Sequence, residues 1–128
     1  MCIRDRCLGR FDDAKKLNAF ITINREGAIE NARQIDEDRQ NGASLGPLAG
    51  IPIAHKDIFC TKGLLTSCGT RILNNFISPY SATVVDRLSA TGVITIGKTN
   101  MDEFAMGSSS EHSYYLSLIH ISEPTRPY

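Results

Sequence analysis

Two lysines stand in patterns whose residue types could do chemistry. Residues 92–99 read GVITIGKT and match the pattern G-x-x-x-x-G-K-[ST], in which a glycine-rich loop wraps nucleotide phosphates. Lys56 closes the apolar part of the stretch IPIAHKDIF. A lysine that loses part of its hydration holds its proton less tightly, and its neutral amine can then serve as a base. The first pattern would bind a nucleotide, and the second would support proton transfer.

The residues around the first pattern predict a strand, whereas a phosphate loop needs flexible backbone. Such a loop follows a strand, and successive N–H groups between its two glycines converge on the anion. Here a helical pattern, TVVDRLSAT, precedes Gly92, and the β-branched run Val-Ile-Thr-Ile separates it from Gly97. We therefore expect residues 93–97 to form a buried strand. Gly92 would end the preceding helix, and Lys98 would not touch a nucleotide.

Lys56 is expected on a second strand, over residues 51–59. A period of two divides this strand between two faces, with Ile51, Ile53, His55 and Asp57 on one and Pro52, Ala54 and Lys56 on the other. The small residues beside Lys56 would leave space above the sheet next to the amine. A structural lysine, with a packed stem and a paired or hydrated ammonium, is the alternative, and from residue chemistry alone it is the commoner case.

Helices are expected on either side of these strands. Residues 24–42 have the apolar spacing of an amphipathic helix, Gly42 stands where a C-terminal cap belongs, and the acidic run 36–38 is typical of a solvated face. Ser81 or Thr83 would cap the helix TVVDRLSAT. This alternation of helices and strands is typical of an α/β layered protein.

Two further short helices are expected. Residues 71–76 have a helical pattern after a loop at 60–70. Asn100, with Glu103 three positions later, has the form of a capping box. This box would open a short helix that Gly107 ends.

Length, charge and cysteine content limit the classes of protein to which the chain can belong. The 128 residues suffice for one domain, and 14 basic and 14 acidic side chains cancel, so no global charge attracts nucleic acid or anionic lipid. Four cysteines without a C-x-x-C pair suit a reducing cytoplasm, and they form no zinc-ligand pattern with the three histidines. The longest uncharged apolar stretch, residues 45–54, is too short to span a membrane. We expect a cytoplasmic chain that itself binds no metal and no cofactor.

Four motifs, LNAFITIN, LAGIPIAHKD, ATVVDRL and GKTNMDEFAMGSS, occur in the order found in the amidase signature family. Residues 17–115 closely resemble the N-terminal part of that family. GIPIAxKD alone would indicate the wider family, and the extension NMDEFAMGSS favours the branch that supplies the glutaminase subunit of tRNA-dependent amidotransferases. The resemblance implies an α/β fold, namely the N-terminal part of the amidase signature fold, in which a mixed β-sheet is sandwiched between helices. The fold would be incomplete in this chain.

The resemblance also implies a mechanism, amide hydrolysis by a Ser–cis-Ser–Lys triad. The family lysine matches Lys56, which would draw a proton through a bridging serine while a second serine attacks the glutamine carboxamide, giving an acyl-enzyme and ammonia. Both serines, and the N–H groups that hold the oxyanion, belong to a Gly/Ser-rich signature further downstream. Ser108, Ser109 and Ser110 are expected in a loop after the short helix and do not match those serines. We therefore expect the 128-residue chain to be inactive alone.

The same branch implies partners. These are the B and C subunits of the amidotransferase, with glutamine as substrate, Glu-tRNA(Gln) reached through the complex, and ATP and Mg used on the B subunit. Three alternatives remain open at this point. The chain could belong to a stand-alone amidase of the same fold, to a non-catalytic assembly module, or, least in keeping with the residues, to a nucleotide-binding protein.

The two ends of the chain depart from the family pattern. After EHSYY the family continues differently, whereas here LSLIHISEPTRPY follows, and both this tail and the opening MCIRDR resemble translated adaptor sequence. We expect residues 1–6 to be a non-native leader, residues 7–115 the N-terminal portion of an amidase domain, and residues 116–128 a non-native tail. His120 and Cys2 would then have no function.

Overall fold

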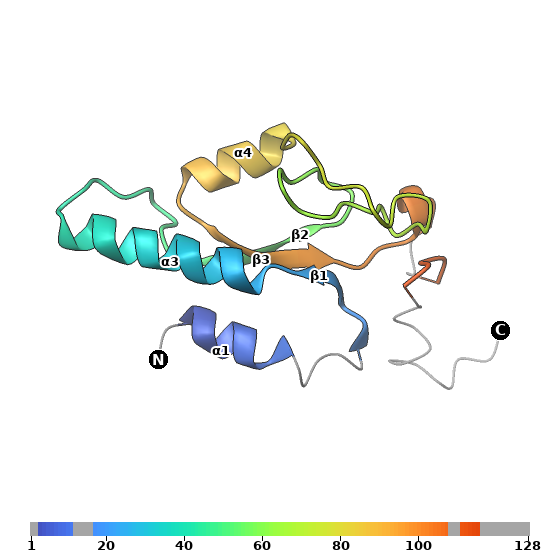
Figure 1. Ribbon diagram of the computed structural model, residues 1–128, viewed down its shortest axis with the longest axis horizontal. Coiled ribbons are helices and arrows are strands. Elements are labelled where there is room, and N and C mark those ends of the chain that lie inside the picture. The colour runs from blue at the N-terminus through green and yellow to red at the C-terminus, as the bar shows by residue number, and fades with distance from the viewer. Residues whose placement is uncertain (1–2, 12–16, 108–110, 116–128) are drawn as a thin grey trace.

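The computed structural model describes residues 3–11, 17–107 and 111–115. It consists of a small sheet with helices on both faces (Figure 1). The elements follow in the order α1 (Ile3–Gly9), β1 (Phe20–Ile23), α3 (Arg25–Gln40), β2 (Pro52–Lys56), α4 (Thr83–Ala90), β3 (Ile94–Thr99) and a short 3-10 helix, η2 (Glu103–Ala105). Helices α1 and α3 lie on one side of the sheet, and α4 lies on the other (Figure 1).

The sheet is mixed, as the resemblance implied. Its strand order is β1-β3-β2, so that β3 lies in the middle. β1 pairs with β3 in antiparallel orientation, and β2 pairs with β3 in parallel orientation. At the carboxyl ends of the two parallel strands, His55 lies opposite Lys98 and Lys56 opposite Thr99. Because β3 has neighbours on both edges and a helix on each face, the β-branched run expected to form a buried strand does so.

A β-bulge interrupts the pairing of β2 with β3. Ile53 pairs with Thr95 but the next residue, Ala54, pairs with Gly97, so one residue of β3 is extra. An extra residue reverses the alternation of side chains beyond it. Ile96 therefore packs with the α3 side, whereas Lys98 emerges on the opposite side. Without the bulge, Lys98 would share the face of Ile96.

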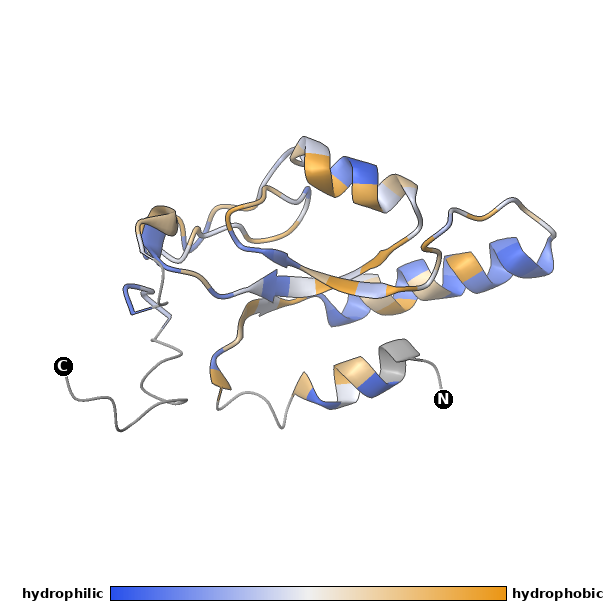
Figure 2. Cartoon of the chain, turned by 180° about the vertical axis from the view of Figure 1, so that it is seen from behind, coloured by the Kyte–Doolittle hydropathy of each residue, from blue (hydrophilic) through white to orange (hydrophobic). Residues whose placement is uncertain are grey.

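The hydrophobic core lies between the sheet and the two N-terminal helices. Its buried side chains come from α1, the second residue after it, α3 and β3, and they are Leu8, Phe11, Ala28, Ala32, Ile94 and Ile96. Burying one isoleucine of this kind contributes roughly 1.5–3 kcal/mol. Figure 2 shows hydrophobic residues along the middle of the sheet, while α3 presents a largely hydrophilic surface. The amphipathic pattern of α3 thus follows its position over the sheet.

The two longer predicted helices are confirmed, with one error at a cap. Helix α3 ends at the C-cap Asn41, and Gly42 follows with a φ of 72°, a left-handed conformation that favours glycine. Gly92 takes the same role after α4, with a φ of 86°. The N-cap of α4 is Ala82, which has no side chain to bond the helix, so neither expected residue caps it. Ser81 accepts a hydrogen bond from the Lys62 N–H instead.

The short helix expected over residues 71–76 is wrong. The segment forms turns, and a second pairing of the backbone begins at its last residue. Leu65 and Ile77 form an isolated antiparallel bridge, and the Thr66 N–H donates to the Phe76 carbonyl at 3.0 Å. The local helical pattern is overridden by this contact between the two sides of one long loop.

The capping box expected at Asn100 is wrong as well. Its side-chain oxygen accepts hydrogen bonds from the Met101 N–H at 2.8 Å and the Ser113 hydroxyl at 2.6 Å. The helix that follows is only the 3-10 turn η2, and Phe104 within it has a φ of 50°. The Asn100 side chain therefore joins two loop segments and does not begin a helix.

Two elements were not expected from the pattern of the sequence. Strand β1 is only four residues long, and helix α1 covers Ile3–Gly9, which overlaps the expected leader at residues 1–6. The boundary of that leader stays a prediction. The tail at 116–128 and the serines at 108–110 lie outside the described residues. Within the described part, no helix has the length and apolarity to cross a membrane.

Candidate active site

Lys56 is the last residue of β2, at the carboxyl end of the parallel strand pair. Its carbonyl accepts a hydrogen bond from the Phe59 N–H at 3.0 Å, so the chain turns immediately after it. The expected free space above Ala54 is absent, since Ala54 packs against the core beneath α1 and α3. The Lys56 side chain is exposed in the structure. Other groups can therefore approach the Lys56 side chain at the end of β2.

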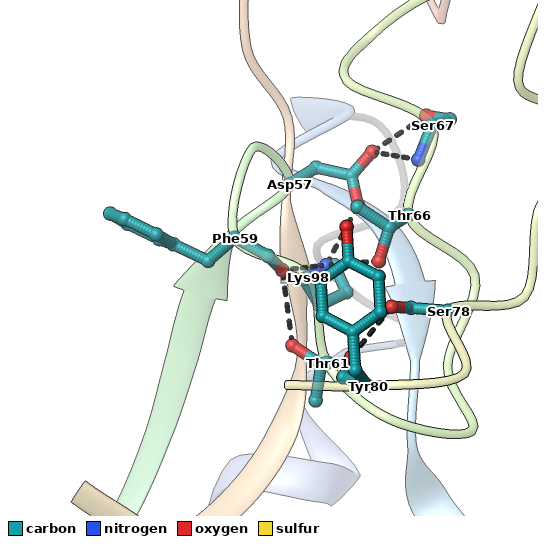
Figure 3. A network of polar contacts seen from close by, with 8 residues as sticks. All are labelled: Asp57, Phe59, Thr61, Thr66, Ser67, Ser78, Tyr80 and Lys98. Atoms are coloured by element: carbon teal, nitrogen blue, oxygen red, sulfur yellow. Dashed lines mark hydrogen bonds and ion pairs between the residues drawn. The ribbon is translucent and has the colours of Figure 1, made fainter. Parts of the chain in front are cut away.

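Lys98 and Asp57 form an ion pair on the other side of the same strand ends (Figure 3). The Lys98 Nζ lies 3.2 Å from the Asp57 Oδ1, and both side chains are 0% exposed. The bulge explains this position, because it turns Lys98 to the face on which period two already places Asp57. Two charges of opposite sign are thus buried directly behind the end of β2.

The remaining polar atoms of this pair are bonded by the loop after β2 (Figure 3). The Lys98 ammonium donates to the Phe59 carbonyl at 2.9 Å and to the Thr66 hydroxyl at 3.1 Å. With the ion contact to Asp57, three polar groups thus surround the ammonium. The Asp57 Oδ2 accepts the Ser67 N–H at 2.8 Å and the Ser67 hydroxyl at 2.6 Å. The Asp57 Oδ1 faces the ammonium and accepts no hydrogen bond within the described residues.

Neutral groups surround the ion pair. Burial lowers the pKa of His55, and the nearby Lys98 charge lowers it further. The His55 Nε2 lies 3.2 Å from the Thr95 hydroxyl, a neutral partner. Burial also raises the pKa of Cys68, and the Asp57 carboxylate adds to the shift. A neutral imidazole and a protonated thiol are therefore favoured beside the pair, so the charges of Lys98 and Asp57 balance mainly each other.

The GKT pattern forms part of strand β3 and not a phosphate-binding loop. Residues of the pattern form β3, and a β-carbon on Gly97 would meet the Thr22 carbonyl oxygen at 2.4 Å, so the backbone is in close contact with β1. The strand expected over residues 93–97 is confirmed. The buried Lys98 ammonium already donates to Phe59 and Thr66 and pairs with Asp57. That Lys98 does not touch a nucleotide remains a prediction, now with a physical reason.

The segment after β3 is tied to the loop after β2. The Thr70 hydroxyl donates to the Glu103 carboxylate, and the Tyr114 N–H donates to the Gly69 carbonyl. The Asp102 carboxylate accepts the His112 N–H at 2.9 Å. Hydrogen bonds therefore connect the NMDEFAMG segment to the loop at 57–70. Lys98 contacts that same loop from the sheet.

Sequence reasoning placed Lys56 correctly at a strand end but did not find its buried neighbours. One signal was available. Asp57 follows the last residue of β2, and Lys98 is the only charged residue of β3, so two opposite charges stand at the same end of two adjacent strands. Within the described ranges, no three His, Cys, Asp or Glu side chains are arranged to hold a metal ion. The expectation that no metal binds stays a prediction.

Comparisons with known proteins agree with the motifs and the fold. The sequence model of the family described as Amidase matches residues 5–126. The A subunit of glutamyl-tRNA(Gln) amidotransferase from Azoarcus sp. (strain BH72) is 61% identical over 99 residues, which are 77% of this chain and 20% of that protein. The chain thus spans about a fifth of the length of this curated relative.

Solved structures share the fold. The crystal structure of the glutamyl-tRNA(Gln) amidotransferase A subunit from Thermotoga maritima gives a TM-score of 0.71 at 33% identity, covering 89% of this chain and 23% of that one. Native peptide amidase from Stenotrophomonas maltophilia gives a TM-score of 0.79 at 31% identity, covering 90% and 25%. The family match extends over nearly the whole sequence, and the mixed sheet between helices is the expected one. The chain belongs to the amidase family.

Proposed function

We propose that this chain is the N-terminal part of the glutaminase subunit, the A subunit, of a glutamyl-tRNA(Gln) amidotransferase. The observation that carries the proposal is the 61% identity, over 99 residues, to a protein of that name. Fold similarity alone does not choose this branch, because the peptide amidase has a higher TM-score than the amidotransferase protein, 0.79 against 0.71. The longer protein that contains this chain is called the full-length subunit.

The proposed reaction is the hydrolysis of the glutamine side-chain amide to glutamate and ammonia. Lys56 accepts a proton from a bridging serine, which in turn accepts the proton of the nucleophilic serine. The serine oxygen attacks the carboxamide carbon, and the proton returns to the nitrogen as ammonia leaves. Water then cleaves the acyl-enzyme and releases glutamate. The exposed amine of Lys56 at the strand ends supports this role, because the serines can approach it from outside the chain.

The proposed partners follow from the same identity. Ammonia passes to Glu-tRNA(Gln), whose glutamate is activated with ATP and Mg on the B subunit, and the C subunit completes the complex in the cytoplasm. The zero net charge of the chain supports a subunit that leaves tRNA binding to its partner.

Two other functions remain to be tested. The higher TM-score to a peptide amidase favours a stand-alone amidase as the second candidate. A non-catalytic assembly module is the third, and it predicts that Lys56 is dispensable.

The test is to produce the full-length subunit with the B and C subunits and to measure ammonia release from glutamine and formation of Gln-tRNA(Gln). Both activities together support the amidotransferase. Amide hydrolysis that needs no partner and forms no Gln-tRNA(Gln) would indicate a stand-alone amidase. Formation of the complex with no hydrolysis would indicate an assembly role, and hydrolysis that survives Lys56→Ala would show that Lys56 is not the proton acceptor.

A further inference from the structure

The Lys98–Asp57 pair contacts the backbone turn that directly follows Lys56. Lys98 reaches this turn twice, at the Asp57 carboxylate (3.2 Å) and at the Phe59 carbonyl (2.9 Å). The turn itself is closed by the hydrogen bond from the Phe59 N–H to the Lys56 carbonyl. One buried ammonium therefore bonds the first and the third residue after Lys56.

The same turn is also held from the sheet and from the loop beyond it. The Asp57 N–H donates to the Thr99 carbonyl at 3.1 Å, which extends the pairing of β2 with β3 by one residue. The Asp57 carboxylate accepts two hydrogen bonds from Ser67, ten residues further along the chain. The backbone after Lys56 thus has fixed partners on three sides, and the side chain of Lys56 points away from all of them, to the opposite face.

We propose that Lys98 and Asp57 are positioning residues for Lys56: their buried ion pair clamps the turn after β2 and so fixes where the Lys56 amine stands. This inference rests on the proposed function, in which Lys56 takes part in proton transfer. It gives the GKT lysine a role inside the protein in place of phosphate binding.

The physical basis is the sensitivity of proton transfer to geometry. A misplacement of a reacting group by about 1 Å can lower a rate about a hundredfold, even when the change lies away from the chemistry. A flexible lysine stem adds its own freedom, so the position of its Cα must be set by the backbone. The ion pair would fix the position of the Lys56 Cα from the face of β2 opposite to the Lys56 side chain. Its loss should reduce kcat and leave glutamine binding nearly intact.

The main experiment uses Lys98→Met and Asp57→Asn in the full-length subunit, in complex with the B and C subunits. Each change keeps the side-chain volume close to the original and removes one charge. We expect kcat for ammonia release to fall about tenfold to a hundredfold, and KM for glutamine to change less than about twofold. Values are taken per folded protein, from the amplitude of the thermal unfolding transition.

Val85→Ala is the matched control. Val85 is buried in α4, with 2% of its surface exposed, and belongs to neither strand end. The change lowers stability by removing buried methyl groups, and we expect kcat to stay within about twofold of the original. A Val85→Ala protein that loses kcat as strongly as Lys98→Met would show that kcat follows general stability, and the positioning role would be withdrawn.

Ser67→Ala keeps the proposal testable if the charge variants do not fold. It removes one hydrogen bond to the Asp57 carboxylate, leaves the ion pair in place, and should lower kcat a few-fold at constant KM. Unchanged kcat in Ser67→Ala and in every charge variant that folds would overturn the positioning role and leave the proposed function intact. A change confined to KM would overturn it as well. A full-length subunit without glutaminase activity, or one that keeps it after Lys56→Ala, would overturn the proposed function and this inference with it.

Discussion

The Lys98 ammonium and the Asp57 carboxylate lie 3.2 Å apart, and neither side chain is exposed to solvent. Removing two charges from water costs several kcal/mol per ion, and their attraction offsets this only when their other donors and acceptors are also bonded. Here Ser67 donates twice to the carboxylate, and Phe59 and Thr66 accept from the ammonium. Loss of one partner therefore leaves the other charge buried without compensation.

The first prediction concerns stability. In the full-length subunit, Lys98→Met should lower the free energy of unfolding by about 3–5 kcal/mol, because it leaves the Asp57 carboxylate buried and unpaired. Combining it with Asp57→Asn should cost less than Lys98→Met alone, since no lone charge remains. Urea unfolding measures both. Additive losses in the double variant would show that the two side chains do not interact in the folded protein.

The position of this pair also shows what sequence patterns can and cannot predict. The residues of α3 and α4 have helical spacing and stop at glycines that take a left-handed conformation, so both helices were predicted from local signals. Strands β2 and β3 were predicted from apolar and β-branched runs. Strand β2 ends at Lys56, three residues before the end of the expected strand, but period two holds throughout it, so Lys56 and His55 lie on opposite faces as predicted.

Long-range pairing explains the errors. Simple alternation along β3 would place Lys98 on the α3 side, and only the register with β2 reveals the bulge that reverses it. The segment at 71–76 and the side chain of Asn100 were misassigned because their partners, Leu64–Thr66 and Ser113, are far away or belong to another loop. The periodicity of a short segment cannot predict contacts with residues far along the chain.

The second prediction concerns Lys56. Lys56→Ala in the full-length subunit should abolish glutamine hydrolysis without unfolding the protein, because the side chain is exposed and contributes little packing. Lys56→Arg should fail equally, since a guanidinium keeps its proton near neutral pH and cannot accept another. Ammonia release and thermal unfolding are the measurements. Near-normal turnover of Lys56→Arg would contradict the assignment of Lys56 as the proton acceptor.

The third prediction concerns pH. Burial lowers the pKa of His55 in the folded protein, so the unfolded chain binds more protons once the pH falls toward the ordinary histidine value, about 6.5. The stability linked to His55 is therefore complete above that value and is lost as the pH falls through and below it. His55→Gln, which can still bond Thr95, should flatten this loss between about pH 7.5 and 5.5. Equal pH slopes for the two proteins in urea unfolding would rule out a role for His55.

The fourth prediction concerns nucleotides. ATP titrated into the full-length subunit, without the B and C subunits, should give no saturable binding at Lys98, because its buried ammonium already donates to Phe59 and Thr66 and pairs with Asp57. Isothermal titration calorimetry is the measurement. Lys98→Met should change stability and leave the titration flat. A micromolar site lost in Lys98→Met would show that the strand opens to form a phosphate loop after all.

The last prediction is that the 128-residue chain alone is inactive and poorly stable. Strands β1 and β2 each have an outer edge that no described residue covers, and such edges pair readily with other chains. Large apolar side chains are exposed around the strand ends, with Ile72, Ile77 and Met106 at 77%, 56% and 83%. In the proposed full-length subunit these surfaces pack against the rest of the amidase fold, and the zero net charge does little to keep isolated copies apart.

The measurement is size exclusion and thermal unfolding of residues 1–128, with ammonia release from glutamine assayed in parallel. We expect aggregation or a broad transition without cooperativity, and no ammonia, because Lys56 alone has no serine through which to act. A monomer with a cooperative transition would mean that the three-stranded sheet and its helices are enough for an independent domain. The edges of β1 and β2 would then have to be protected by residues outside the described ranges.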